Sequence, residues 1–114
     1  MSNRFDVVVT RFPAVVEYLK DIGLIDDQTE ICLAPVKQTE IIEKISGKRV
    51  IGDLSLRFAA LAKVFTRVRF RTTADERRNP KLMTKEKVIK KLAETSQPIV
   101  TYEINKISEE EIKV

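Results

Sequence analysis

Short runs of β-branched residues alternate along this chain with segments of helical periodicity, and this alternation restricts the fold more than any other feature. The runs expected to form strands span residues 4–9, 29–35, 49–52, 66–72 and 99–104. The segments between them carry apolar residues at helical spacing and are expected to begin at Pro13, Thr39, Ser55 and Thr84. This order predicts an α/β domain of three layers, with a mainly parallel five-stranded sheet between helices.

The expected helices are amphipathic, and Gly23 is a suitable residue to end the first of them. The third carries a stripe at i, i+3, i+4 and i+7, which predicts a helix through Phe58, Leu61, Ala62 and Phe65. The second and fourth are expected to turn these residues inward: Ile41, Ile42, Ile45, Val88, Ile89, Leu92 and Ala93. Residues 74–83 are polar and contain Asn79-Pro80, which predicts a loop.

Length and composition indicate one domain. The chain has 114 residues, 43% of them hydrophobic, and we expect a single domain over residues 1–107 followed by a mobile acidic tail at 108–114. No apolar run is long enough for a signal peptide or a membrane span, so neither is expected. The single cysteine, Cys32, lies in an apolar run. It is interpreted as a buried strand residue in a reducing compartment, which favours the cytoplasm.

Histidine is absent from the sequence, which removes the commonest general base and the commonest metal ligand. The acidic residues are scattered, and the chain lacks both the glycine-rich dinucleotide fingerprint and the Walker phosphate loop. We therefore expect no metal and no cofactor. A Ser-His-Asp or Cys-His catalytic set is impossible in this chain.

Positive charge is concentrated in one part of the chain. The formal charge is +4, but residues 67–91 carry ten basic and three acidic groups, a surplus of seven. Residues 1–66 are balanced at nine of each, and residues 92–114 carry two basic and five acidic groups. Such a local surplus suits a polyanionic ligand, although a solvated helix face without a partner would look the same.

Ligands of open parallel sheets bind outside the carboxyl ends of the strands, where arginines and helix N-termini attract phosphate. The loops expected there predict a ligand-binding site made of Thr10, Arg11, Phe12, Gly52, Leu54, Ser55, Arg71, Thr72, Arg77 and Arg78, with Asp53 as its carboxylate. Each residue also has a simpler explanation. Ser55 can serve only as a helix cap, Arg11 can cover the sheet end, and the arginines after residue 76 can keep a loop soluble.

Three segments of the chain resemble one family. VVVTRFPAVVEYLKDIGLI at the start, RVIGDLSLRFAALA at 49–62 and ADERRNPKLMTKEKV at 74–88 are similar, in the same order, to the motifs of small accessory proteins of type III CRISPR systems. The family has histidine where this chain has Phe12, and glycine where it has Ala14. Asp53 and Ser55 stand where threonine and proline are usual.

This resemblance implies a ring nuclease with the Rossmann-like fold of the CARF superfamily. Such a protein binds cyclic oligoadenylate, most often cyclic tetra-adenylate, and cleaves it to switch off the antiviral response. A homodimer would place the ring on its two-fold axis. No stable protein partner and no membrane partner are implied.

Cleavage of such a ring needs no metal, because each 2′-hydroxyl can attack the neighbouring phosphorus in line and leave a 2′,3′-cyclic phosphate. The expected catalytic residues are Arg11 and Arg78 for phosphate charge, Ser55 for orientation and Asp53 as a weak candidate base. Thr10 would add orientation.

Three other functions remain open at this stage. They are a protein that sequesters the ring without cleaving it, a general RNA- or DNA-binding protein that uses residues 67–91, and a structural subunit without a small ligand. Among the residues of 67–91, only Phe70 is aromatic, which argues against stacking on long single strands.

Overall fold

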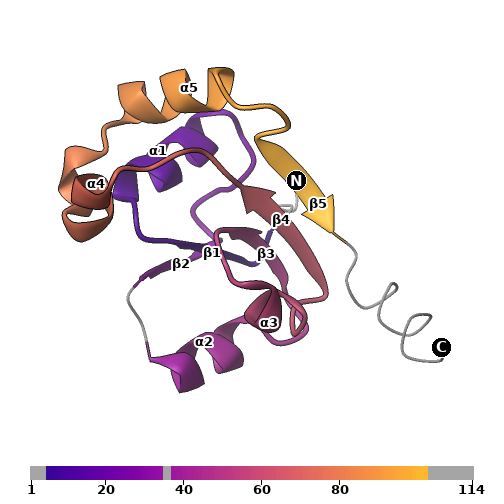
Figure 1. Ribbon diagram of the computed structural model, residues 1–114. Coiled ribbons are helices and arrows are strands. Elements are labelled where there is room, and N and C mark those ends of the chain that lie inside the picture. Colours follow the sequence, from indigo (N-terminus) through magenta and orange to yellow (C-terminus); the bar gives the residue numbers. More distant parts are fainter. Residues whose placement is uncertain (1–4, 35–36, 103–114) are drawn as a thin grey trace, which may run out of the picture.

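Strands and helices alternate in the computed structural model, which describes residues 5–34 and 37–102 (Figure 1). The strands are β1 (Val7–Thr10), β2 (Glu30–Leu33), β3 (Arg49–Gly52), β4 (Val64–Val68) and β5 (Ile99–Tyr102). The helices are α1 (Pro13–Asp21), α2 (Gln38–Ile45), α3 (Leu56–Ala59), α4 (Ala74–Arg78) and α5 (Lys85–Ala93), with a 3-10 turn, η1, at Pro80–Leu82.

The five strands form one sheet in the order β2-β1-β3-β4-β5. The first four are parallel, and β5 pairs with β4 in the antiparallel direction. The chain enters β5 beside the carboxyl end of β4, where the amide of Arg69 donates to the carbonyl of Pro98 at 2.9 Å. This Rossmann-like sheet confirms the predicted α/β class and the mainly parallel pairing.

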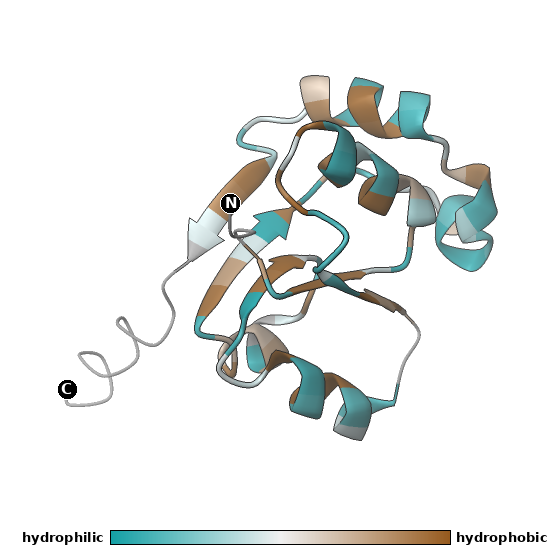
Figure 2. Ribbon diagram, turned by 180° about the vertical axis from the view of Figure 1, so that it is seen from behind, coloured by the Kyte–Doolittle hydropathy of each residue, from teal (hydrophilic) through white to brown (hydrophobic). Residues whose placement is uncertain are grey.

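Helices lie on both faces of the sheet, α1 and α5 on one and α2 and α3 on the other (Figure 1). Each face has its own core. Val8, Ile51 and Val88 belong to the core beneath α1 and α5, while Val9, Val50 and Phe65 belong to the core beneath α2 and α3. Because both faces of β1 and β3 are covered, the central residues of these strands are apolar, and most of their length is brown in Figure 2.

Several predicted boundaries are confirmed. Helix α1 begins at Pro13, and Gly23 follows its end with a φ of 78°, a left-handed conformation that favours glycine. The side chain of Thr84 caps α5 by accepting from the amide of Lys87 at 3.2 Å. Cys32 is buried in β2, as its apolar neighbours predicted.

The predicted third helix is too long. Helix α3 ends at Ala59, and Phe65 lies in β4, where it is fully buried and pairs in register with Val50. The apolar spacing over 58–65 is compatible with a helix, but pairing between β3 and β4 takes the last residues of that stripe into the sheet.

The predicted loop at 74–83 contains the helix α4 and the turn η1 instead. Thr73 and Glu76 form a capping box: the Thr73 side chain accepts from the amide of Glu76 at 3.1 Å, and the Glu76 carboxylate accepts from the amide of Thr73 at 2.9 Å. The Thr-x-x-Glu spacing is a helix-start signal that the polar composition of the segment obscured.

Smaller differences concern helix faces and ends. Lys37, not Thr39, is the N-cap of α2, and the side chains of Ile42 and Ile89 are exposed rather than turned inward. Ala93 is exposed as well. Strands β2 and β4 end at Leu33 and Val68, earlier than predicted. The predicted acidic tail and the end of the last predicted strand lie outside the described residues.

Candidate ligand-binding site

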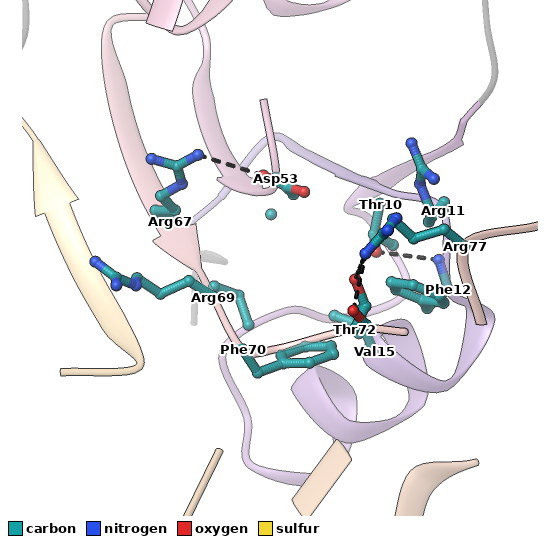
Figure 3. A pocket seen from close by; sticks show the side chains of 12 residues that line it. Thr10, Arg11, Phe12, Val15, Asp53, Arg67, Arg69, Phe70, Thr72 and Arg77 are labelled. Carbon is teal, nitrogen blue, oxygen red and sulfur yellow. Dashed lines mark hydrogen bonds and ion pairs between the residues drawn. The ribbon is translucent and has the colours of Figure 1, made fainter. Parts of the chain in front are cut away.

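A cavity of about 430 Å³ opens where β1, β3 and β4 end (Figure 3). Three loops and the last residues of β4 build it. Its lining consists of Thr10, Arg11, Phe12, Val15, Gly52, Asp53, Arg67, Val68, Arg69, Phe70, Thr72 and Arg77. Since parallel strands bring their carboxyl ends to one edge, the topology itself gathers residues that are up to 67 positions apart in the sequence.

The turn between β1 and α1 is held by the side chain of Thr10. Its buried Oγ1 accepts from the amide of Phe12 at 3.2 Å, and Pro13 then starts the helix. The arrangement fixes the direction of the chain before α1 and leaves Arg11 exposed at the mouth of the cavity. The cavity therefore lies next to the positive end of a helix.

Gly52 allows the backbone to pass close to β1 at the floor of the cavity. A Cβ atom on this residue would lie 1.9 Å from the carbonyl oxygen of Val9, and its φ of 136° is one that other residues rarely adopt. The next amide, that of Asp53, donates to the same Val9 oxygen at 2.8 Å. A glycine at this position thus joins β3 to β1 and directs Asp53 to the cavity.

Asp53 supplies the one carboxylate among the described residues that line the cavity. Its Oδ1 lies 3.7 Å from Nη2 of Arg67, and the Asp53 side chain is 69% exposed. An ion pair at this distance and exposure is weak and leaves both groups accessible to a ligand.

Helix α4 carries Arg77 on the side of the cavity that faces Arg67 and Arg69 (Figure 3). Nη1 of Arg77 donates to the carbonyl oxygen of Thr72 at 2.8 Å and to its Oγ1 at 3.0 Å. Figure 3 places the guanidinium groups of Arg11 and Arg77 on one side of the opening and those of Arg67 and Arg69 on the other. A ligand between them would face cations from both sides.

Glu76 anchors helix α4 to Thr73, in the loop after β4, and to Lys91 on α5. This carboxylate is buried, accepts from the amide of Thr73 and lies 3.3 Å from Nζ of Lys91. The hydrogen bond from Thr73 and the nearby ammonium group of Lys91 lower the pKa of Glu76. Lys91 also donates to the carbonyl of Arg71 at 2.9 Å, so it links α5 to the loop that positions Arg77.

Two aromatic rings form an apolar part of the wall. Phe12 is buried and Phe70 half-buried, with their ring centroids 6.0 Å apart and their planes inclined by 40°. The geometry is that of a favourable aromatic pair. The half-exposed ring of Phe70 offers a surface on which a planar base can stack.

The structure brings seven of the eleven predicted site residues to this cavity, namely Thr10, Arg11, Phe12, Gly52, Asp53, Thr72 and Arg77. The other four lie elsewhere. Leu54 is buried in the core beneath α2 and α3, and Arg71 lines a second cavity. Exposed Ser55 starts α3 with its carbonyl, which accepts from the amides of Phe58 and Ala59. Arg78 pairs with Asp75 at 2.5 Å outside the lining.

Five lining residues were not predicted: Val15, Arg67, Val68, Arg69 and Phe70. Arg67 and Arg69 fall within the predicted strand 66–72 and the basic stretch 67–91, but neither feature assigned them to the cavity. Because β4 ends at Val68, Arg69 and Phe70 belong to the loop at the carboxyl edge instead. The cavity thus has four guanidinium groups, those of Arg11, Arg67, Arg69 and Arg77, against one carboxylate, a composition suited to phosphate oxygens.

The fold and this cavity together define a Rossmann-like α/β protein with a basic cavity at the carboxyl edge of its sheet. Comparison of the chain with protein-family models, with curated proteins and with solved structures finds no match. Within the described residues, no helix is long and apolar enough to cross a membrane. Nor do these residues place three or more histidine, cysteine, aspartate or glutamate side chains where they could hold a metal ion.

Proposed function

We propose that this protein binds cyclic oligoadenylate, most readily cyclic tetra-adenylate, in the arginine-lined cavity and cleaves it without a metal ion. The observation that carries the proposal is the composition of the lining: four guanidinium groups on two sides of the opening and the half-buried ring of Phe70 beside them. Arginine forks suit phosphodiester oxygens, and Phe70 suits an adenine ring. The resemblance to type III CRISPR ring nucleases supplies the ligand class.

The size of the cavity supports a homodimer. Its volume of about 430 Å³ is within the range of small-molecule sites, roughly 300–1,000 Å³. A ring of four nucleotides is larger than this volume, so one protomer would enclose only part of it. Two copies related by a two-fold axis would enclose the ring from both sides, because the ring has a matching two-fold symmetry.

Cleavage would use the nucleophile that the ligand carries. A 2′-oxygen attacks the adjacent phosphorus, the bond to the 5′-oxygen breaks, and the products end in a 2′,3′-cyclic phosphate and a 5′-hydroxyl. The proton leaves the 2′-hydroxyl for Asp53 or solvent, and the 5′-oxygen takes one from solvent. Since Ser55 and Arg78 lie outside the cavity, we assign the stabilisation of phosphate charge to Arg11, Arg67 and Arg77.

A second candidate function is sequestration of the ring without cleavage. One observation favours it: the chain has no histidine, the commonest general base at neutral pH. In that case the protein would lower the free concentration of the signal by binding it stoichiometrically.

Incubation of excess protein with cyclic tetra-adenylate in EDTA, followed by chromatography, separates these functions. The proposal predicts linear fragments with 2′,3′-cyclic phosphate ends. An unchanged ring that co-elutes with the protein would identify sequestration instead. If the ring neither changes nor binds, while long single-stranded RNA binds with a steep salt dependence, the protein is a general nucleic-acid binder.

A further inference from the structure

A second cavity, of about 640 Å³, adjoins the first at the same edge of the sheet. Its walls come from the segment after β4, which contributes Arg69, Phe70 and Arg71, and from the end of α5 and the following loop. Arg69 and Phe70 line both cavities, so the two spaces meet at these residues. The proposed function uses only the first.

The second cavity differs chemically from the first. Its cations are the exposed guanidinium groups of Arg69 and Arg71, since the ammonium group of Lys91 is already held by Glu76 and by the Arg71 carbonyl. The loop after α5 contributes hydrogen-bond acceptors, namely the Glu94 carboxylate and the hydroxyls of Thr95 and Ser96. Acceptors and cations together suit a nucleoside joined to a phosphate.

The residues shared by the two cavities are held in place from both sides. The amide of Arg69 donates to the Pro98 carbonyl at 2.9 Å, and the ring of Phe70 packs on Phe12 with centroids 6.0 Å apart. Arg69 is thus held through its backbone, and its exposed side chain lines both cavities beside the packed ring of Phe70. This arrangement suits the junction of two nucleotides. The guanidinium group can take the bridging phosphate while the ring supports one base.

We propose that the second cavity holds the nucleotide adjacent to the one in the arginine-lined cavity, so that the smallest ligand filling the whole site is a linear dinucleotide. The proposal rests on the proposed function, because it assumes a nucleotide in the first cavity. It adds that the protein binds linear oligonucleotides of two or more residues, including the linear products of ring opening, in preference to mononucleotides.

Calorimetric titration with 5′-AMP and with the linear dinucleotide pApA tests this directly. The unmodified protein is expected to bind pApA at least about tenfold more tightly than AMP, which corresponds to one stacked base and one phosphate contact. Arg71→Ala changes a side chain that lines only the second cavity. It should lower the affinity for pApA more than the affinity for AMP and so remove most of that preference.

Arg78→Ala is the matched control, because Arg78 is an exposed arginine that lines neither cavity. It should leave the affinities for AMP and pApA unchanged. Equal affinities of the unmodified protein for AMP and pApA, or equal losses in the two variants, would overturn the second-cavity proposal alone if cyclic tetra-adenylate still binds. If no adenylate binds, the proposed function fails and this inference fails with it.

Discussion

Gly52 lies where the backbones of β1 and β3 approach each other beneath the cavity. Any side chain there meets the Val9 carbonyl, which is part of the backbone and cannot turn away. The position therefore has two requirements, an unusual φ and an absent Cβ. Both follow from the pairing of Val9 with Gly52 in the parallel sheet.

Gly52→Ala is expected to lower the free energy of unfolding by roughly 2–4 kcal/mol, from backbone strain together with steric overlap. Gly47→Ala is the control. Gly47 also has a positive φ, of 70°, but no atom lies within 4 Å of its added Cβ. Its cost should be that of strain alone, about 1–2 kcal/mol. Equal losses in urea denaturation would show that the contact with Val9 does not determine the effect.

Residue patterns in the sequence predicted positions at the cavity correctly where they lay at the end of a strand or directly after it. Thr10 and Gly52 end their strands, and Arg11 and Asp53 follow at once, so the sequence predicted the place of all four at the cavity. Ser55 and Arg78 could not be placed in this way. Ser55 lies three residues beyond the end of β3 and Arg78 ten residues beyond the end of β4, and the direction of side chains so far from a strand end depends on packing.

At the scale of elements, α4 is the part that positions Arg77, and the capping box at Thr73 defines where this helix begins. Only one turn and a half long, α4 has little intrinsic stability. Its hydrogen bonds to Thr73 and the contact between Glu76 and Lys91 replace the packing that a longer helix would have.

Thr73→Ala is expected to cost about 1 kcal/mol of stability through the lost cap and to weaken binding of cyclic tetra-adenylate as well. Thr84→Ala removes the same kind of cap from α5, at 3.2 Å, outside the lining of the first cavity. It should cost similar stability with ligand affinity unchanged. Thermal melts and titrations of both variants check this. A binding loss in Thr84→Ala as large as that in Thr73→Ala would contradict the positioning role of α4.

The direction of β5 depends on how whole helices and strands are arranged, not on any single residue. Alternation predicted five strands and mainly parallel pairing, but the added helix and turn between β4 and α5 were hidden in a polar segment. Helix α5 ends beside the carboxyl edge of the sheet, where Lys91 donates to the Arg71 carbonyl. Strand β5 therefore starts at that edge and runs antiparallel to β4. Sequence periodicity contains no information on that return path.

On the scale of the whole molecule, cavities lie at the carboxyl edge of the sheet, and stabilising contacts lie at its amino edge. The carboxyl edge holds the cavities, whereas at the other edge Asp6 accepts from the Arg49 side chain at 3.1 and 3.3 Å and from its amide at 2.9 Å. These contacts tie the start of β3 to the residue before β1. The hydrogen bonds and the charge of Arg49 lower the pKa of Asp6.

A carboxyl group whose pKa is lower in the folded state stabilises the protein above the unfolded-state pKa. This contribution is lost as the pH falls through the folded-state value. Both Asp6 and Glu76 are of this kind, so the free energy of unfolding should fall below about pH 4.5. Asp6→Asn is expected to cost roughly 1 kcal/mol at neutral pH, since the pair is partly exposed, and to flatten this acid dependence. Urea denaturation from pH 3 to 7 checks it, and an unchanged slope would contradict the assignment.

The most direct measurement of the central claim is calorimetric titration of cyclic tetra-adenylate into the unmodified protein, Arg77→Ala and Arg78→Ala. The two arginines are neighbours in sequence on α4, and only Arg77 lines the cavity. Loss of a charged hydrogen-bond donor to phosphate should weaken binding by Arg77→Ala about tenfold or more. Arg78→Ala should bind like the unmodified protein. Equal affinities of all three proteins, or equal losses in both variants, would contradict a ligand held in this cavity.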